Sequence, residues 1–596
     1  MPALFGAVGL DQPAADSLER EFATAFGALE TRRTQEWLLG GHAHGGHRAI
    51  RQCERGWFAV DGEVEASERT PFELSSGWLE LQPAARGVIA LLEEDGGVHV
   101  ACDWLNSVPV YYASHRGGFA FSSHMRPLAR SLGCAPDPVG LMEYLREAAF
   151  PSERTALQGV FRLLPGQSLR FRAGEGVTVS ETSRLWTHDP IGSRAADPAD
   201  AAELLWSRLL EALARLEGAR RPALMLSAGW DSRTLIAGLR EVGHRDVLAY
   251  THGHPRAREI RLVRRLARVA GVRLEVASLD AGLLRMNDLE DTFARSENLV
   301  FLHWTQAGRR LKSLGANVVM AGVLGEILGG HYGSTMIRTG PGRFLDLGRR
   351  MLGRSSPSSK QARAIDLLGP SFAELPWYAN KHAWPGVADL AAGMRADIER
   401  DLSRLRGRGV PEGDQLVEAY QTETRGCQHI CSQLDAARSY LPATAPFADR
   451  SLAEAATCLP LETKIHNRLS RAMLARHAPD LLRLPLAATL ARADRPLIFQ
   501  EISRAARWGI ETAHWAVYRK AGGRLPAPRW GWVDFAFLRA GTLRTLAEQL
   551  RSSLWDMDAI ESAVNWIEGP EGLRNVHPWY DQFGKMLTID FLLRSP

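Results

Sequence analysis

The sequence contains little cysteine, and this excludes a fold that is held together by disulfide bonds. Only six cysteines occur among 596 residues: Cys53, Cys102, Cys134, Cys427, Cys431 and Cys458. Cys427 and Cys431 flank His429 in a spacing that resembles a zinc motif, but no second pair of ligands lies nearby in the sequence. Because a spacing of four residues also places two side chains on one helix face, we expect buried thiols here rather than a metal site.

The chain also lacks an excess of one charge, a block of basic residues and a long apolar run. Lys and Arg number 72 against 68 Asp and Glu, so the formal net charge is +4. Such a balance of charges does not indicate a surface that binds nucleic acid. No apolar segment reaches membrane-spanning length, and no basic N-terminal region is followed by an apolar one. We therefore expect a cytoplasmic protein with neither nucleic acid nor a membrane as its partner.

What the sequence does have is length, since 596 residues are too many for a single hydrophobic core. Residues 1–185 contain short strands separated by glycine-rich turns, which is typical of an antiparallel sheet layer. Over residues 199–500 strands alternate with helices, which favours a parallel sheet with ligands at the carboxyl ends of its strands. Its strands are predicted at 222–226, 247–250, 272–277 and 317–321. Residues 501–596 are predicted to form a helical C-terminal extension.

A turn of small residues, Leu-Ser-Ala-Gly-Trp-Asp-Ser over 226–232, joins the first of these strands to a helical pattern. A strand, a turn and a helix N-terminus in this order direct backbone N–H groups and hydroxyl groups at one place. The helix dipole favours negative charge there, so phosphate is the expected guest, with a divalent metal on Asp231. The predicted nucleotide contacts in this loop are Leu226, Ser227, Gly229, Asp231 and Ser232. The alternative is ordinary helix capping, because Asp and Ser are good N-cap residues.

This turn resembles the Ser-Gly-Gly-x-Asp-Ser pyrophosphate loop of the asparagine synthetase family, with Ala228 in place of one glycine. Further segments follow in the family's order over roughly residues 1–490, namely Met1–Gly6, Trp57–Glu63, Asp103–Tyr112, Phe121–His124, Leu164–Gly166 and Pro446–Asp449. The resemblance implies an α/β fold with two domains. The first, over 1–185, would be a glutaminase-like domain, an Ntn-hydrolase-like antiparallel β-sandwich layer. The second, over 199–500, would be an ATP-pyrophosphatase synthetase domain, an adenine-nucleotide α-hydrolase-like parallel sheet with a helical C-terminal part.

The start of the chain departs from the glutamine-hydrolysing members of that family. In those members the residue after Met1 is a cysteine, whose amine and thiol form the nucleophile. Pro2 has no thiol, so hydrolysis of glutamine by this route is excluded. Asp61 also stands where the family has an asparagine. The resemblance therefore points to the family's glutaminase-inactive branch, similar to β-lactam synthetases, lasso-peptide cyclases and natural-product amide synthetases, which take the amine from their own substrate.

The second acidic loop of the family is altered too. Residues 321–331, Ala-Gly-Val-Leu-Gly-Glu-Ile-Leu-Gly-Gly-His, resemble Gly-Glu-Gly-Ser-Asp-Glu-x-Phe-Gly-Gly-Tyr. Alignment on the paired glycines retains Glu326, whereas the family's metal-binding aspartate falls on Gly325 and its first glutamate on Gly322. We expect Gly322 to contribute to the nucleotide site. Glu326 is expected to be the second magnesium ligand and a catalytic residue.

Near the position of the family's catalytic lysine, this chain supplies only arginine. Leu484-Pro485 is in place, and Arg492 or Arg495 would then stabilise negative charge on an oxyanion or phosphate. We take Arg492 as the catalytic candidate. His331 and Tyr332 follow the second acidic loop, where an acid or a base could act.

The sequence thus predicts an ATP-dependent, AMP-forming amide synthetase with Mg²⁺ on Asp231 and Glu326. A carboxylate would attack the α-phosphate, and an amine of a small molecule or peptide would displace AMP to give an amide, lactam or isopeptide. Family analogy places it in natural-product biosynthesis, and a homodimer is allowed. Two alternatives stay open. One is a non-catalytic relative that serves as a scaffold or binding protein, and the other is an amidotransferase that uses free ammonia.

Overall fold

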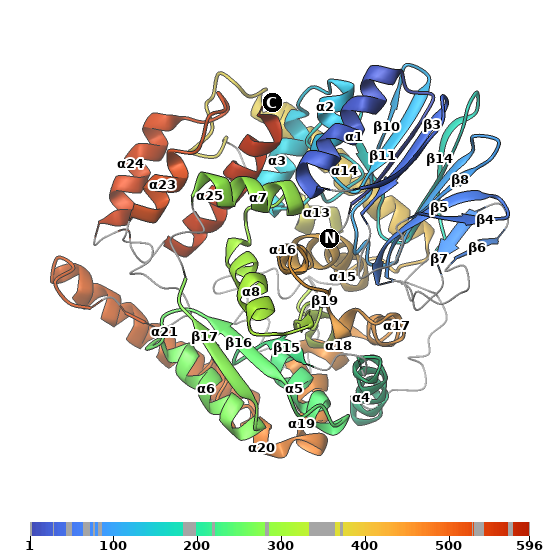
Figure 1. Cartoon of the computed structure of the whole chain (residues 1–596). Helices are drawn as coiled ribbons and strands as arrows, with labels where there is room; N and C mark the ends of the chain where they lie inside the picture. Colours follow the sequence, from blue (N-terminus) through green and yellow to red (C-terminus); the bar gives the residue numbers. More distant parts are fainter. Residues whose placement is uncertain are drawn as a thin grey trace.

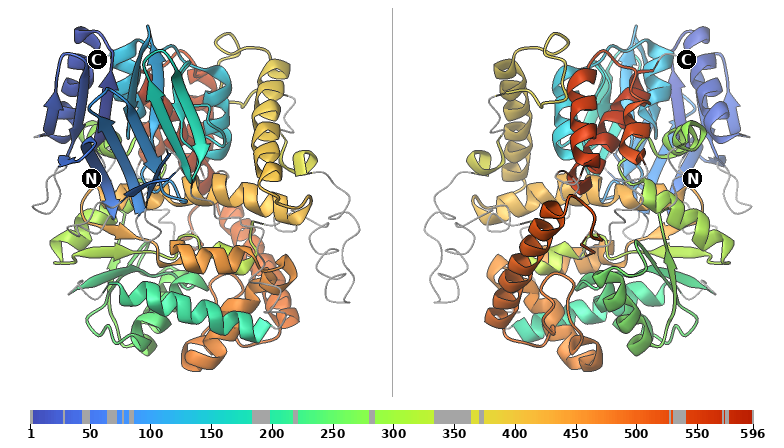
Figure 2. Two further views of the ribbon diagram at one scale, coloured as in Figure 1. Left: turned by 90° about the vertical axis from the view of Figure 1, so that its right-hand side faces the viewer. Right: turned by 90° about the vertical axis from the view of Figure 1, so that its left-hand side faces the viewer.

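The computed structural model (Figure 1) places an antiparallel N-terminal part over a parallel C-terminal sheet. It describes residues 3–27, 29–42, 50–63, 72–75, 78–81, 86–182, 198–216, 221–279, 285–332, 364–369, 374–526, 528–529, 541–569, 572 and 576–594. Figure 2 shows the two parts one above the other, seen from both sides.

Two six-stranded antiparallel sheets form the N-terminal part and pack face to face. The first sheet contains, in spatial order, β12 (Phe161–Arg162), β10 (Tyr111–His115), β11 (Gly118–Ser122), β1 (Leu4–Val8), β3 (Trp37–Gly41) and β2 (Glu30–Arg33). The second contains β14 (Gly176–Glu181), β13 (Gln167–Arg172), β9 (Val98–Cys102), β8 (Arg86–Glu93), β5 (Gly56–Glu63) and β4 (Ile50–Cys53). A hairpin of β6 (Phe72–Ser75) and β7 (Trp78–Leu81) accompanies the second sheet. The predicted antiparallel layer is confirmed.

The residues of strand β1 do not alternate between apolar and polar, because both faces of the strand are buried. Leu4 and Val8 lie in the core between the two sheets. Phe5 and Ala7 lie in a second core, shared with the helices α1 (Gln12–Phe26), α2 (Met125–Leu132) and α3 (Pro138–Glu147). Since successive side chains of a strand point to opposite faces, both faces of β1 are buried.

The C-terminal part is built on a five-stranded parallel sheet, as predicted. Its spatial order is β17 (Arg273–Ala277), β16 (Leu248–His252), β15 (Pro222–Met225), β18 (Val318–Met320) and β19 (Ala443–Thr444). After β15 the chain builds the sheet in one direction, through β16 and β17, and then returns to add β18 on the other side of β15. The carboxyl ends of β15 and β18 therefore flank the point where the strand order reverses, which is where ligands bind in open parallel sheets.

Helices surround this sheet and connect it to the N-terminal part. Those of the first half are α4 (Pro198–Ala214), α5 (Asp231–Glu241), α6 (Arg258–Ala270), α7 (Met286–Ser296), α8 (Leu302–Ser313) and α9 (Glu326–Gly329). They are followed by α13 (Ala364–Leu368), α14 (Val387–Gly407), α15 (Asp414–Gln421), a π-helix η3 (Thr422–Ile430), α16 (Ser432–Arg438), η4 (Pro446–Ala448), α17 (Arg450–Thr457), α18 (Leu461–Lys464), η5 (Ile465–Asn467), α19 (Arg468–His477) and α20 (Pro479–Leu482). Among the described helices, none is both long enough and apolar enough to cross a membrane.

The last helices of the chain extend from the C-terminal part to the N-terminal part (Figure 1). They are α21 (Leu497–Lys520), α23 (Leu543–Ala547), α24 (Met557–Glu568) and α25 (Val576–Leu593). Helix α25 contacts α3, and Lys585 Nζ donates to the carbonyl oxygens of Leu145 and Arg146 at 3.0 and 2.9 Å. An ammonium group there satisfies free carbonyls at the C-terminus of α3 and complements its dipole. The described end of the predicted extension 501–596 thus shares a core with the N-terminal sheet.

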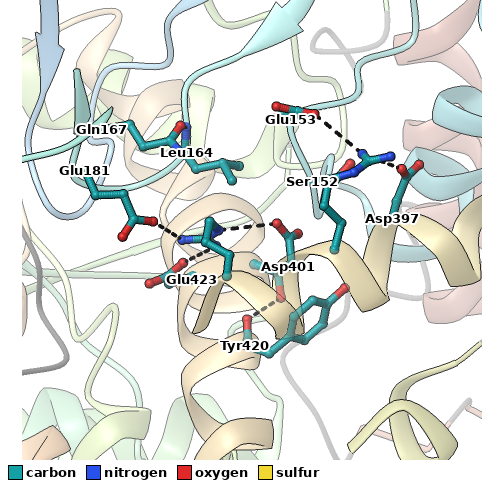
Figure 3. A network of polar contacts seen from close by, with 12 residues as sticks. Ser152, Glu153, Leu164, Gln167, Glu181, Asp397, Asp401, Tyr420 and Glu423 are labelled. Carbon is teal, nitrogen blue, oxygen red and sulfur yellow. Dashed lines mark hydrogen bonds and ion pairs between the residues drawn. The ribbon is translucent and has the colours of Figure 1, made fainter. Parts of the chain in front are cut away.

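A network of ion pairs joins the N-terminal sheets to α14 and the π-helix. Figure 3 shows the carboxylates of Glu181, Asp401 and Glu423 converging. The guanidinium of Arg404 lies 3.2, 3.5 and 2.7 Å from them, respectively. Arg408 pairs with Glu181 and Glu423 at 2.6 and 2.5 Å. Since Glu181 ends β14, this network fixes helix α14 against the second sheet.

Within this network Asp401 confers a pH dependence on stability. Its side chain is buried, and burial raises its pKa from 3.8 to about 7, although Arg404 opposes the shift. The folded protein then keeps this proton while the unfolded chain has lost it, so stability falls as pH rises from about 4 to about 7. We expect Asp401→Asn, which cannot titrate, to gain about 2–4 kcal/mol relative to the wild type across that range. Melting temperatures of both proteins at several pH values measure this, and a constant difference between them would contradict the assignment.

Candidate functional site

The turn between β15 and α5 is closed by the hydroxyl group of Ser232. This hydroxyl donates to the carbonyl oxygen of Ser227 at 2.9 Å and accepts its N–H at 3.1 Å. The two hydroxyl oxygens lie 3.0 Å apart, and Ser227 Oγ accepts the N–H of Gly229 at 3.3 Å. Leu226 is buried, and its N–H donates to the carbonyl oxygen of Tyr250 on β16 at 2.8 Å. The loop therefore exposes Ser227 at the carboxyl end of β15, beside the free N–H groups that begin α5.

Asp231 opens α5, Glu326 opens α9, and the neighbouring strands β15 and β18 bring them together. Burial and then the charge of Glu326 raise the pKa of Asp231 well above its usual range. Burial also raises the pKa of Glu326, although the charge of Arg425 opposes the shift. Glu326 Oε2 has no hydrogen-bond partner within the described part of the chain. Each carboxylate disfavours ionisation of the other, and a cation bound to both would relieve this.

Gly322 and Gly325, which align with acidic residues of the family that the sequence resembles, make room for Asp231. A Cβ atom added to Gly322 would lie 2.8 Å from Asp231 Cβ, and one added to Gly325 would overlap the Asp231 carboxyl carbon. Between them Leu324 is held at φ +66°, a left-handed conformation that is unfavourable for leucine. The backbone of this loop therefore packs directly on Asp231, and Glu326 is the acid it contributes.

The donor atoms fit a magnesium ion. Neither Asp231 nor Glu326 forms an ion pair with the described residues, and carboxylate oxygens are the ligands that Mg²⁺ prefers. The described ranges hold no group of three or more His, Cys, Asp or Glu side chains that could bind a metal. The remaining ligands of Mg²⁺ would therefore come from phosphate oxygens and water, as is usual for this ion.

Arg233 holds the segment after α20 against the start of α5. Its side chain is fully buried and donates to the carbonyl oxygens of Leu481, Leu484 and Pro485 at 3.0, 2.9 and 2.8 Å. Two residues further along, the N–H of Ala487 donates to the carbonyl oxygen of Ala228 at 3.2 Å. The predicted Leu484-Pro485 element is thus fastened to the turn 226–232.

A cavity of about 240 Å³ opens beside this turn, and we call it the loop cavity. Its wall includes Gly229 and Trp230 from the turn, Thr489 from the fastened segment, and His466 and Asn467. These last two residues adopt φ values of +62° and +57°. Two successive non-glycine residues in the left-handed region store strain, which is typical of ligand sites.

The arginines predicted from the sequence do not reach the loop cavity. Arg492 is exposed and forms a two-nitrogen contact with Asp494, and Arg495 is exposed as well. The guanidinium that does line the cavity belongs to Arg504 of α21, which pairs with Glu501 at 3.2 Å. A short loop turns Arg492 outward, whereas the first turns of α21 direct Arg504 inward.

A second cavity, which we call the large cavity, has a volume of about 660 Å³. It lies between α3 of the N-terminal part and α9, α15 and the π-helix, and its wall includes Glu326 and Tyr332. His331 lines both cavities, so the two adjoin at this residue. Burial and then Glu326 raise the pKa of Tyr332 well above its usual range, and its hydroxyl is buried without a hydrogen-bond partner within the described ranges.

Two other residues of the sequence resemblance have structural contacts. Asp449 caps α17, since its side chain accepts the N–H groups of Ser451 and Leu452 at 3.1 and 3.2 Å, and it also pairs with Arg215. Asp61 accepts the N–H of Ala3 at 2.5 Å. Pro2 lies outside the described residues.

The charged residues that were not predicted from the sequence include Arg504, Arg425 and Glu143 of these walls, and Arg233, which holds the segment beside the loop cavity. Each lies within a helical pattern, where charged residues are common on the solvent-facing side, so the pattern does not indicate that these side chains line a cavity. Of these residues, Arg425 lies in an unusual element, the π-helix over Thr422–Ile430. Turns of π-helix are frequent at functional sites. Sequence periodicity does not separate a π-helix from an α-helix.

Residues 205–487 match the family model for asparagine synthase, a range that spans just under half of the chain. The matched range contains the turn 226–232, Asp231, Glu326 and most of the walls of both cavities. The match supports membership in the asparagine synthetase family, whose members are ATP-dependent carbon–nitrogen ligases. A comparison with curated proteins gave no match.

Proposed function

We propose that this protein is an ATP-dependent, AMP-forming amide synthetase. It would activate a substrate carboxylate as an acyl-adenylate and transfer the acyl group to an amine, giving an amide, lactam or isopeptide bond. The observation that carries the proposal is the pair Asp231 and Glu326 beside the turn 226–232, within the range that matches the asparagine synthase model.

The phosphates of ATP would lie at the N-terminus of α5. Ser227 is exposed there, Gly229 is half-buried, and the helix dipole favours negative charge. Asp231 and Glu326 would hold Mg²⁺, which supplies positive charge to the phosphates when bound. Gly322 keeps the backbone close to Asp231, and Arg504 offers a guanidinium in the loop cavity. We assign to Arg504 the role that the sequence predicted for Arg492.

These residues would act mainly by positioning the substrates and by stabilising the negative charge of the phosphates. The substrate carboxylate would enter through the large cavity and meet the α-phosphate near His331, where the two cavities adjoin. Pyrophosphate would leave with the electron pair of the broken P–O bond. The amine would then attack the acyl carbon and release AMP, with its proton passing to a nearby base, for which His331 is placed.

The N-terminal part would act as a scaffold without glutamine hydrolysis. Pro2 offers no thiol, and the Asp61 carboxylate is engaged by the N–H of Ala3. The domain assignments over 1–185 and 199–500, the glutaminase-inactive branch and a role in natural-product biosynthesis belong to the same proposal. The amine and carboxylate would both come from small-molecule or peptide substrates.

Isothermal titration with ATP in the presence and absence of Mg²⁺ tests this function. We expect binding that strengthens at least tenfold with Mg²⁺, because the metal relieves repulsion between two carboxylates and the phosphates. Titration with AMP is the matched control, since AMP lacks the phosphates that the metal would contact. Absence of ATP binding at millimolar nucleotide would overturn the proposal and favour the non-catalytic binding protein.

A further inference from the structure

The large cavity contains a guanidinium group that forms no ion pair with any carboxylate among the described residues. Arg425 lines this cavity and is exposed. Within the described ranges it forms neither an ion pair nor a hydrogen bond. The other described arginine of the wall, Arg146, pairs with Glu147 through Nε at 3.0 Å and donates from Nη2 to the carbonyl oxygen of Leu368 at 3.5 Å, while its buried Nη1 has no hydrogen-bond partner among the described residues. Among the described residues of the wall, Arg425 is the exposed arginine, and we consider it as the partner of an anionic ligand.

The π-helix places Arg425 next to the proposed metal site. Its neighbour Gly426 packs on Leu324 and Tyr332 of the second acidic loop, where a Cβ atom would come within 2.9 and 3.2 Å. The charge of Arg425 lowers the pKa of Glu326 against the effect of burial. A carboxylate bound to Arg425 would consequently lie beside the residues that approach the phosphates of ATP.

Glu143 is a second unsatisfied group in the same cavity. This side chain of α3 is fully buried, and neither of its oxygens has a hydrogen-bond partner among the described residues. A buried carboxyl without a partner is costly, and a ligand that bonds it would recover this free energy. Burial and then the charges of Asp397, Asp401 and Asp137, opposed by Arg154, raise its pKa well above the usual range. A hydrogen-bond donor such as an amine would therefore satisfy the Glu143 carboxyl.

One part of the wall is apolar. Side chains of Leu367, Leu368, Met394 and Ile398 line the space between these polar groups. A volume of about 660 Å³ falls in the range that accommodates a drug-sized ligand, far more than a carboxylate alone requires. The cavity therefore has room for an occupant with an extended apolar body.

We propose that the large cavity binds the acid substrate, an apolar carboxylic acid that also carries an amine. Arg425 binds its carboxylate, the apolar wall covers its body, and Glu143 binds the amine at another wall of the cavity. This inference rests on the proposed function, because it identifies the acid that the synthetase would activate.

Equilibrium binding without ATP tests the carboxylate site, with octanoate and octanamide as probes. We expect the wild type to bind octanoate at least tenfold more tightly than octanamide, because a charge-assisted bond is lost with the amide. Arg425→Gln should abolish this preference. Arg395→Gln on α14 is the control, since Arg395 is an exposed arginine that pairs with Asp366 at 3.4 Å outside the cavity. Equal losses in the two variants would overturn the assignment.

The amine site is tested with ω-aminoalkanoates of six, eight and twelve carbons against the alkanoates of equal length. We expect at least one ω-amino acid to bind tenfold more tightly than its parent acid, because its ammonium would ionise Glu143 and pair with it, and we expect Glu143→Gln, which cannot ionise, to remove this gain. The glutamine side chain has the shape of the protonated carboxyl, so the variant should fold, and its melting curve checks this. A chain-length series without any gain would overturn the role of Glu143.

The ATP titration separates this inference from the proposed function. A protein that binds ATP and Mg²⁺ but shows no preference for carboxylates retains the function and contradicts the inference. A protein that prefers carboxylates through Arg425 but does not bind ATP supports the acid site and contradicts the synthetase.

Discussion

Replacing Asp231 with asparagine is expected to lower ATP-dependent pyrophosphate release by more than about a hundredfold, the size typical for loss of one preorganised electrostatic contact. Asparagine has nearly the shape of aspartate, so it should keep the packing against Gly322 and Gly325. It removes the charge that would bind Mg²⁺ with Glu326. Release is measured with an enzyme-coupled pyrophosphate assay on a panel of amine-bearing apolar acids.

Two further measurements make this result specific. Asp246→Asn is the matched control, because Asp246 is an exposed aspartate of the same domain that pairs weakly with Arg221 at 3.4 Å. It should leave release unchanged. Since burial and Glu326 raise the pKa of Asp231, the Asp231→Asn protein should be at least as stable as the wild type at neutral pH. Release within threefold of the wild type would show that this carboxylate is not a metal ligand.

Replacing Arg233 with methionine is expected to destabilise the C-terminal part by about 3 kcal/mol or more. Three carbonyl oxygens, those of Leu481, Leu484 and Pro485, would lose their donor in a buried place. Methionine fills most of the volume, so the loss reports on hydrogen bonds rather than on a cavity. Urea unfolding followed by tryptophan fluorescence gives the change in the midpoint.

The same variant should weaken nucleotide binding, because Arg233 fastens the segment that lines the loop cavity. The control is Arg240→Met in the same helix. Arg240 pairs with Asp480 at 2.9 Å, but both side chains are about 40 % exposed, at 40 and 43 %, and such pairs contribute roughly 0–1 kcal/mol. Similar losses in the two variants would show that Arg233 has no special role in holding this segment.

Much of the fold could be predicted from local patterns. The strands at 222–226, 247–250, 272–277 and 317–321 correspond to β15, β16, β17 and β18 within one or two residues. Apolar runs between helical periods are a strong signal for buried parallel strands. Strand β19 has two residues, Ala443–Thr444, and a strand so short has no periodicity to detect.

The residues of the candidate site differ in how well they could be predicted from the sequence. The turn 226–232 is a local element, so its residue types and spacing indicate a phosphate-binding geometry without further knowledge. Arg492 illustrates the limit of this reasoning. Its position after Leu484-Pro485 suggested a site residue, but whether a loop arginine points inward depends on contacts with distant elements, and here it contacts Asp494. Arg504, farther along the chain, lines the cavity instead.

The sequence by itself determined the local chemistry of this protein: a strand, a turn of small residues and a helix that opens with Asp231. These features depend on residues that are neighbours along the chain. Tertiary structure decided that Asp231 faces Glu326, that Arg233 fastens the wall of the loop cavity, and that Arg425 and Glu143 share one cavity. These pairs are separated by many residues and meet only because strand order and helix packing bring them together, which no local pattern encodes.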